Sequence, residues 1–198
     1  MRGMAEGEIS PDSNARYNLQ EAEKNGVKLG VYFFSTAISQ EEAVEEADWT
    51  ADFIAQYPIT YPVVYDCEGF TDMDSRQYGM SKAERTDIAL AFLKRIEQRG
   101  YEGMFYAAKN ELQDETLWET SRIEKHYKIW VAQFPGDADP AVHTSSYTGD
   151  HQMWQYTMEG SVPGISQPVD MNVAYFGYDG VEKPKDETPP AEAFPDVE

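Results

Sequence analysis

The run at residues 61–68, Tyr-Pro-Val-Val-Tyr-Asp-Cys-Glu, holds the residue types that acid catalysis needs. A stretch of strand-forming residues ends in Asp66 and Glu68, with Cys67 between them. Because side chains on a strand alternate faces, the two carboxyl groups share a face, roughly 6.5–7 Å apart along the strand, and Cys67 points the other way. Carboxyl groups at the end of an apolar strand are costly to bury unless they are paired or used. Two interpretations stay open: two solvated acids beside a turn, or a general acid with a partner carboxylate, as in glycoside hydrolysis.

The charge of the chain limits its partners. The 198 residues suffice for one domain, and 36 acidic against 16 basic side chains give a net charge of −20. Such a surface argues against nucleic acid as a partner, since phosphate binding needs basic side chains. A polyanionic cell wall would repel the protein at long range, so docking there needs local contacts or a separate module.

Several kinds of chemistry lack the residues they need. With one cysteine, Cys67, the chain has no internal disulfide, and this residue is most simply a buried small hydrophobe. No Cys/His spacing indicates zinc, and the three histidines are too scattered to serve a cysteine nucleophile. No apolar stretch is long enough to insert into a membrane.

The hydrophobic pattern and the capping residues predict an α/β fold. Ser39 with Glu42, and Ser81 with Glu84, are helix-capping signals. We expect helices at 12–25, 39–57, 81–100 and 112–118, and strands at 28–34, 61–68, 103–108, 128–134, 151–156 and 169–176. Strands that alternate with helices imply parallel pairing. The Pro- and acid-rich residues 182–198 should form a disordered tail or linker after a domain at 1–181.

Landmarks along most of the chain carry a resemblance to a known family. They are Gly30-Val31-Tyr32-Phe33-Phe34, Pro62 to Glu68, Phe105-Tyr106, Ile129-Trp130-Val131-Ala132-Gln133, Met153-Trp154-Gln155-Tyr156, and Val169-Asp170-Met171-Asn172. In this order and spacing they resemble the lysozymes of glycoside hydrolase family 25, the N-acetylmuramidases.

The resemblance implies a modified TIM-type barrel with five strand–helix units followed by three strands. It implies an extracellular or cell-wall enzyme that cleaves the β-1,4 bond between N-acetylmuramic acid and N-acetylglucosamine in peptidoglycan, with no metal or organic cofactor. Glu68 matches the proposed general acid of the family, and Asp66 the second acid of the same motif. Asp170 matches an acid on the final strand that faces the same pocket.

The chain departs from the family pattern at its N-terminus. The family carries an Asp-x-Ser-like motif on its first strand, and we find no such strand before Asn18. We therefore expect about the first two barrel strands to be lacking, which would leave sheet edges open and weaken activity. A longer parent chain could also carry a cell-wall-binding module. The alternatives to an active hydrolase are a non-catalytic glycan-binding module and an inactive fragment on the same scaffold.

Six further residues are candidates for binding the glycan, because the active sites of such barrels gather at the C-terminal strand ends. Tyr32 and Phe34 share a strand face and either form core layers or line a sugar cleft. The others are Tyr106, Trp130, Gln133 and Gln155. The two glutamines can bond sugar hydroxyls and acetamides, but they can equally hold loops, the interpretation that we favour slightly for Gln133.

Overall fold

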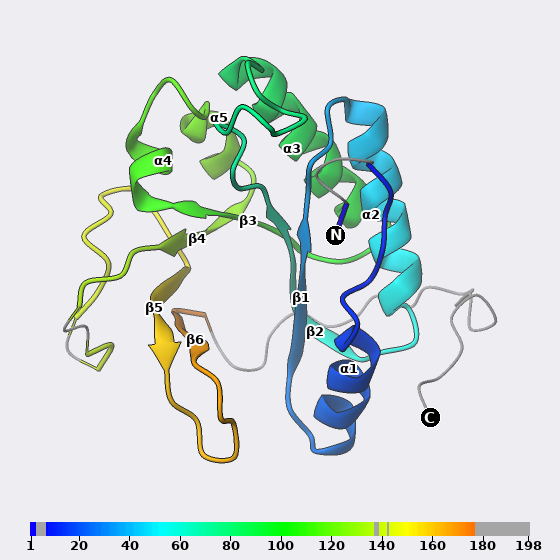
Figure 1. The fold of residues 1–198 in the computed structure, drawn as a ribbon, viewed down its shortest axis with the longest axis vertical. Coiled ribbons are helices and arrows are strands. Elements are labelled where there is room, and N and C mark those ends of the chain that lie inside the picture. Colours follow the sequence, from blue (N-terminus) through cyan, green and yellow to red (C-terminus); the bar gives the residue numbers. More distant parts are fainter. Residues whose placement is uncertain (3–6, 137–138, 142, 177–198) are drawn as a thin grey trace.

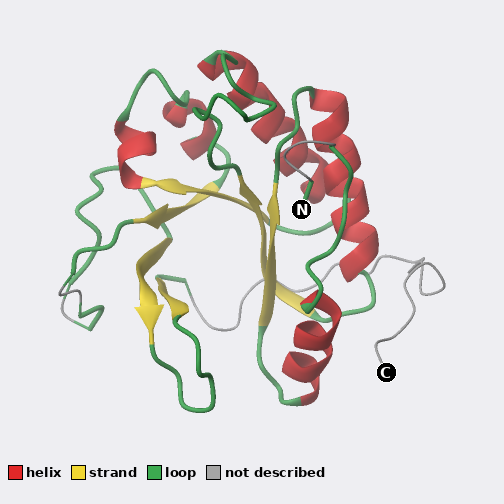
Figure 2. Cartoon of the chain, viewed as in Figure 1, coloured by secondary structure: helices red, strands yellow, loops and turns green. Residues whose placement is uncertain are grey.

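The fold is built on one curled sheet with helices on its convex side (Figures 1 and 2). The computed structural model describes residues 1–2, 7–136, 139–141 and 143–176, so the predicted tail at 182–198 lies outside the described residues. The strands are β1 (Leu29–Phe34), β2 (Ile59–Asp66), β3 (Gly103–Ala108), β4 (Lys128–Ala132), β5 (Met153–Gly160) and β6 (Val169–Ala174). In the described residues the sheet has six strands in chain order, parallel from β1 to β5, with β6 antiparallel to β5. The predicted α/β fold, a modified TIM-type barrel, is confirmed.

The predicted caps set where the two long helices begin. The helices are α1 (Ala15–Lys24), α2 (Gln40–Ile54), α3 (Lys82–Gln98), α4 (Lys109–Gln113) and α5 (Thr120–Glu124). The Ser39 side chain accepts a hydrogen bond from the Glu42 amide, and Ser81 with Glu84 forms a complete capping box. None of the described helices is long and apolar enough to cross a membrane.

The single short helix predicted at 112–118 is wrong. The chain instead forms α4, which shares only Leu112 and Gln113 with this segment, and α5, which follows it. The Asp114 side chain accepts hydrogen bonds from the Thr116 amide at 2.8 Å and from the Thr116 hydroxyl at 2.7 Å. This local bonding offers the backbone a turn in place of a further helical turn, so α4 ends at Gln113.

The hydrophobic core lies between the convex face of the sheet and the helices. Tyr65 of β2 packs on Phe92 of α3 with ring centroids 5.3 Å apart, and Phe105 of β3 packs on Trp118 at 4.9 Å. Alternation along the strands sends the neighbours of these residues, such as Asp66 and Tyr106, to the concave face. The core therefore fixes which side chains line the hollow of the half barrel.

The outer edge of β1 is met by the N-terminal residues. The Arg2 amide donates to the Phe34 carbonyl at 3.0 Å, and the Arg2 guanidinium bonds the buried Glu46 carboxylate of α2 at 2.6 Å. Ser35 donates its hydroxyl to the same carboxylate, also at 2.6 Å. These contacts place a short segment against the end of the edge strand.

Candidate active site

Asp66 and Glu68 lie at the C-terminal end of β2 in different surroundings. Asp66 is only 6% exposed, and its Oδ1 has no hydrogen-bond partner in the described part of the structure, whereas Glu68 is exposed to solvent. Cys67 points to the opposite side, where its buried thiol donates to Gln77 Oε1 at 3.3 Å. The strand thus holds one acid in the sheet and presents the other to the cleft.

The electrostatics of the pair favour a proton on Asp66. Burial, the charge of Glu68 and the charge of Glu111 together raise the pKa of Asp66 to about 8. Burial also raises the pKa of Glu68, and the neighbouring charge that adds to this effect is that of Asp170. The spacing of Asp66 and Glu68 along the strand would by itself suggest the charge of Asp66 in that role. The partner differs because the pKa of Asp66 is itself raised to about 8, so Asp66 carries little negative charge in the neutral range.

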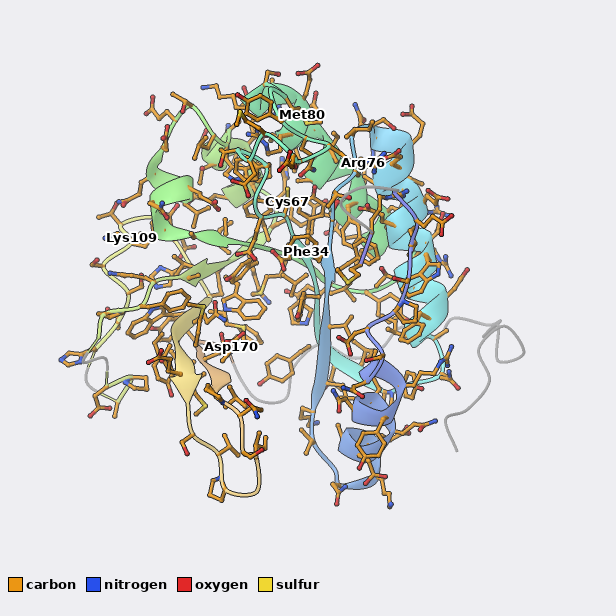
Figure 3. All side chains as sticks on the ribbon, viewed as in Figure 1. Phe34, Cys67, Arg76, Met80, Lys109 and Asp170 are labelled. Atoms are coloured by element: carbon orange, nitrogen blue, oxygen red, sulfur yellow. The ribbon has the colours of Figure 1, made fainter. Side chains whose placement is uncertain are left out.

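Asp170 approaches the pair from the other end of the sheet. It is an exposed residue on β6, the strand farthest from β1 in the sheet order. Figure 3 shows Asp170 across the hollow from Phe34. The charges of Asp170, Glu68 and Asp66 all add to the effect of burial in raising the pKa of the Tyr106 hydroxyl. The curl of the sheet therefore brings three acids to one hollow.

Aromatic and amide side chains line the hollow beside the acids. Tyr106 and Trp130 are register partners on β3 and β4, with ring centroids 5.0 Å apart in an edge-on arrangement. The Tyr106 hydroxyl donates to Gln155 Oε1 at 2.8 Å, and the Trp130 indole donates to Asn172 Oδ1 at 3.0 Å. The side-chain amide oxygens of Gln155 and Asn172 thus each accept a hydrogen bond, and their NH₂ groups remain to donate to a ligand in the hollow.

Tyr32 and Phe34 stand on the concave side of β1. Tyr32 is 65% exposed. Of the two interpretations that the sequence left open for this residue, a core layer is therefore wrong. Together with Phe34 it lines a groove of about 530 Å³ whose wall also includes Asp66 and Glu68. The cleft with the acids therefore extends along the edge strand.

Gln133 differs from the other candidates. Its Oε1 accepts hydrogen bonds from the Ser145 hydroxyl at 2.7 Å and the Ser146 amide at 2.8 Å, and its Nε2 donates to the Ser146 hydroxyl at 2.8 Å. The side chain is thus committed to holding the loop at 145–146, the role that we favoured from the sequence. Asp66, Glu68, Asp170, Tyr106, Trp130 and Gln155 share the hollow, and Gln133 lies at its rim.

Sequence reasoning missed two residues of this hollow, Asn172 and Glu111. Asn172 lies two positions after Asp170 on the same strand, so strand alternation was a signal that could have found it. Glu111 lies in α4, directly after β3. No Ser, Thr, Asp or Asn precedes that helix as a cap, so no capping signal predicts that a helix begins there.

Among the described residues, no group of three or more His, Cys, Asp or Glu side chains is arranged to hold a metal ion. The chemistry that this arrangement can perform is proton transfer between carboxyl groups and a ligand in the hollow.

The comparisons with known proteins agree with this geometry. A model of the family described as glycosyl hydrolases family 25 matches residues 3–165. No curated protein matches the sequence. Three solved structures with similar folds are the modular autolysin LytC from Streptococcus pneumoniae, in complex with a synthetic peptidoglycan ligand, the spore cortex lytic enzyme SleM from Clostridium perfringens, and the bacterial lysozyme from Streptomyces coelicolor.

The overlap with these structures is partial. For LytC the TM-score is 0.67, with 24% identity over 82% of this chain and 37% of that one. For SleM the TM-score is 0.68, with 20% identity over 89% and 58% of the two chains. For the Streptomyces lysozyme it is 0.66, with 22% identity over 86% and 77%. The chain thus spans less than two thirds of the length of LytC and SleM, and at these identities the likeness shows the fold alone.

Proposed function

Because the chain belongs to family 25 of the glycosyl hydrolases, we propose that it hydrolyses peptidoglycan at the β-1,4 bond between N-acetylmuramic acid and N-acetylglucosamine. The observation that carries the proposal is the acid pair at the end of β2, with Asp66 buried and Glu68 exposed in a hollow that Asp170 also faces. The LytC complex with a synthetic peptidoglycan ligand supports the choice of substrate.

The two acids of β2 take different parts in this reaction. Glu68 is the exposed member, so it can reach the glycosidic oxygen and deliver a proton as that bond breaks. Asp66 retains a proton to about pH 8, and strongly coupled carboxyl groups titrate as a pair. The pair therefore keeps one proton in the neutral range, and Glu68 passes it to the leaving sugar.

The remaining candidates bind and stabilise the substrate. Asp170 acts on Glu68 through its charge, and from the same position a carboxylate can favour the positive charge that develops on the sugar ring. The faces of Tyr32 and Trp130 offer stacking surfaces, and the Gln155 amide NH₂ offers a donor to an acetamide or hydroxyl oxygen. With this substrate the protein acts outside the cell, at the wall.

The experiment is muropeptide release from purified sacculi, with borohydride reduction of the new chain ends before mass spectrometry. Cleavage at the proposed bond leaves reducing N-acetylmuramic acid. We expect Glu68→Gln to lower release by roughly 10²–10⁴-fold, the usual contribution of a general acid. The matched control is Glu115→Gln, which removes the same charge from an exposed position.

Two outcomes would overturn the proposal. Reducing ends of N-acetylglucosamine would mean that the other glycosidic bond is cut. If the wild-type chain bound sacculi without releasing any fragment, it would be a glycan-binding module.

A further inference from the structure

Glu111 lies beside the acid pair because of the register between β2 and β3. Asp66 pairs with Tyr106, the last register pair of the two strands, and Glu68 and Ala108 each follow that pair by two residues. Neighbouring strands lie about 4.8 Å apart. Ala108 is the residue at which β3 ends and α4 begins, and its amide donates to Glu111 Oε2 at 3.3 Å. Glu111 is therefore held at the end of the strand next to the acid pair, where the charge of Glu68 acts on it.

The short helix α4 is itself fixed on both sides, so Glu111 has a defined position. Leu112 is buried in the hydrophobic core, and the Lys109 ammonium donates to the Ser146 hydroxyl at 2.7 Å. Figure 3 marks Lys109 at the start of α4, next to the end of β3. Glu111 is half-buried, so its charge is only partly screened by solvent.

Among the described residues, no salt bridge neutralises the acids of the hollow. In the part of the chain that the structure describes, no ion pair involves Asp66, Glu68, Glu111 or Asp170. The basic group whose charge acts on Glu111 is Arg85 of α3. Its guanidinium donates to the Leu117 and Met80 carbonyls and stacks on Phe70 at 4.0 Å, so it is committed to the core.

We propose that Glu111 is a positioning residue of this site: a further carboxylate whose negative charge extends to higher pH the range in which the pair Asp66 and Glu68 keeps one proton. The use made of that proton rests on the proposed function, but its retention does not. Burial is the largest influence on Asp66, followed by the charges of Glu68 and then Glu111, which raise the pKa of Asp66 in the same direction. Tyr106 and Asp170 face the same hollow, and neither supplies a positive charge.

The direct test measures the titration of Asp66 by NMR of protein with ¹³C-labelled aspartate side-chain carboxyl groups. The signal of Asp66 is assigned as the one lost in Asp66→Asn. We expect a midpoint near pH 8 in the wild type. In Glu111→Gln it should fall by roughly half a pH unit, the size of effect that one nearby charge has on a partly screened site. Gln keeps the acceptor for the Ala108 amide, so the start of α4 is preserved.

Two further variants separate charge from structure. Glu111→Asp keeps a carboxylate, so its midpoint should stay closer to that of the wild type than to that of Glu111→Gln. Glu115→Gln, with its charge removed from an exposed position two residues after the end of α4, should leave the midpoint unchanged. A midpoint in Glu111→Gln equal to that of the wild type would overturn the proposal, and so would an equal fall in Glu115→Gln.

The pH profile of muropeptide release then links Glu111 to catalysis. We expect the alkaline limb of the Glu111→Gln profile to move to lower pH by the same amount as the NMR midpoint, because the proton is lost from the pair at lower pH. If the midpoint falls but the wild-type chain releases nothing from sacculi, the proposed function fails and the role of Glu111 stands. An alkaline limb that stays in place while the midpoint falls would show that catalysis does not use this proton.

Discussion

Asp66 imposes a cost on folding that a solvent-facing carboxylate would not. Its pKa rises from an ordinary value of 3.8 to about 8 in the folded protein, chiefly through burial. A raised pKa means that the folded state binds the proton more tightly than the unfolded chain. The contribution of Asp66 to stability is therefore most favourable below pH 3.8, and it is lost as the pH rises from there towards 8.

We predict that Asp66→Asn stabilises the protein while it impairs catalysis. Since the amide cannot ionise, the variant escapes the cost of keeping a buried carboxyl group near neutral pH. At pH 7 its free energy of unfolding should exceed that of the wild type by on the order of 2 kcal/mol, and the difference should vanish near pH 4. Urea unfolding at several pH values measures it, with the exposed Asp74→Asn as the control. A difference that does not vary with pH would contradict the prediction.

The packing of α2 and the N-terminal residues against β1 depends on a buried ion pair. Arg2 and Glu46 are almost entirely buried, and burial raises the pKa of Glu46 to about 7 although Ser35 and Arg2 both bond its carboxylate. We predict that Arg2→Ala destabilises the protein by about 3–5 kcal/mol at pH 8, because Glu46 is left buried without its counter-charge. The loss should be smaller at pH 5, where Glu46 can take up a proton.

The matched control for Arg2→Ala is Arg95→Ala, which breaks a half-exposed ion pair with Asp48. That change should cost no more than about 1 kcal/mol at either pH. Urea unfolding measures both variants. Equal losses would mean that the Arg2–Glu46 pair contributes no more than a surface contact, and that the N-terminal residues do not hold α2 to the edge strand.

At the scale of elements, the sequence predicted what depends on local signals. The caps at Ser39 and Ser81 placed the starts of α2 and α3, and the apolar runs placed all the strands within a few residues. The segment 109–124 was misassigned because its helices are only five residues each, too short for a periodic pattern, and because the turn at Asp114 competes with the helix. Glu111 was missed for the same reason.

Asp66 and Glu68 at the end of β2 could be placed on one face from strand alternation, and Asp170 on β6 could be selected from the resemblance of its motif to family 25. The distribution of charge among them could not. Which neighbouring charge raises the pKa of Glu68, that of Asp66 or that of Asp170, depends on how deeply Asp66 is buried and how far the sheet curls. Residue spacing determines neither of these. For Gln133, the deciding contact is with Ser145 and Ser146, in a loop whose path the sequence does not specify.

For the molecule as a whole, parallel pairing is what assembles the site. Because β1 to β5 run in the same direction, their C-terminal ends meet at one rim, and Asp66 and Ala108 arrive there from successive strands. The antiparallel β6 then returns Asp170 across the hollow. The curvature of the sheet visible in Figure 2 turns this row of strand ends into a concave rim.

The net charge of −20 makes the approach to a cell wall depend on salt. A wall rich in anionic polymers repels such a protein, and the repulsion acts over a Debye length of about 30 Å at 10 mM salt but only about 8 Å at 150 mM. We therefore predict that muropeptide release from intact walls rises several-fold between these two salt concentrations. Walls stripped of their anionic polymers are the control, since the same increase in salt should alter release from them little. Release from intact walls that falls with salt would show that local attraction, rather than long-range repulsion, governs docking.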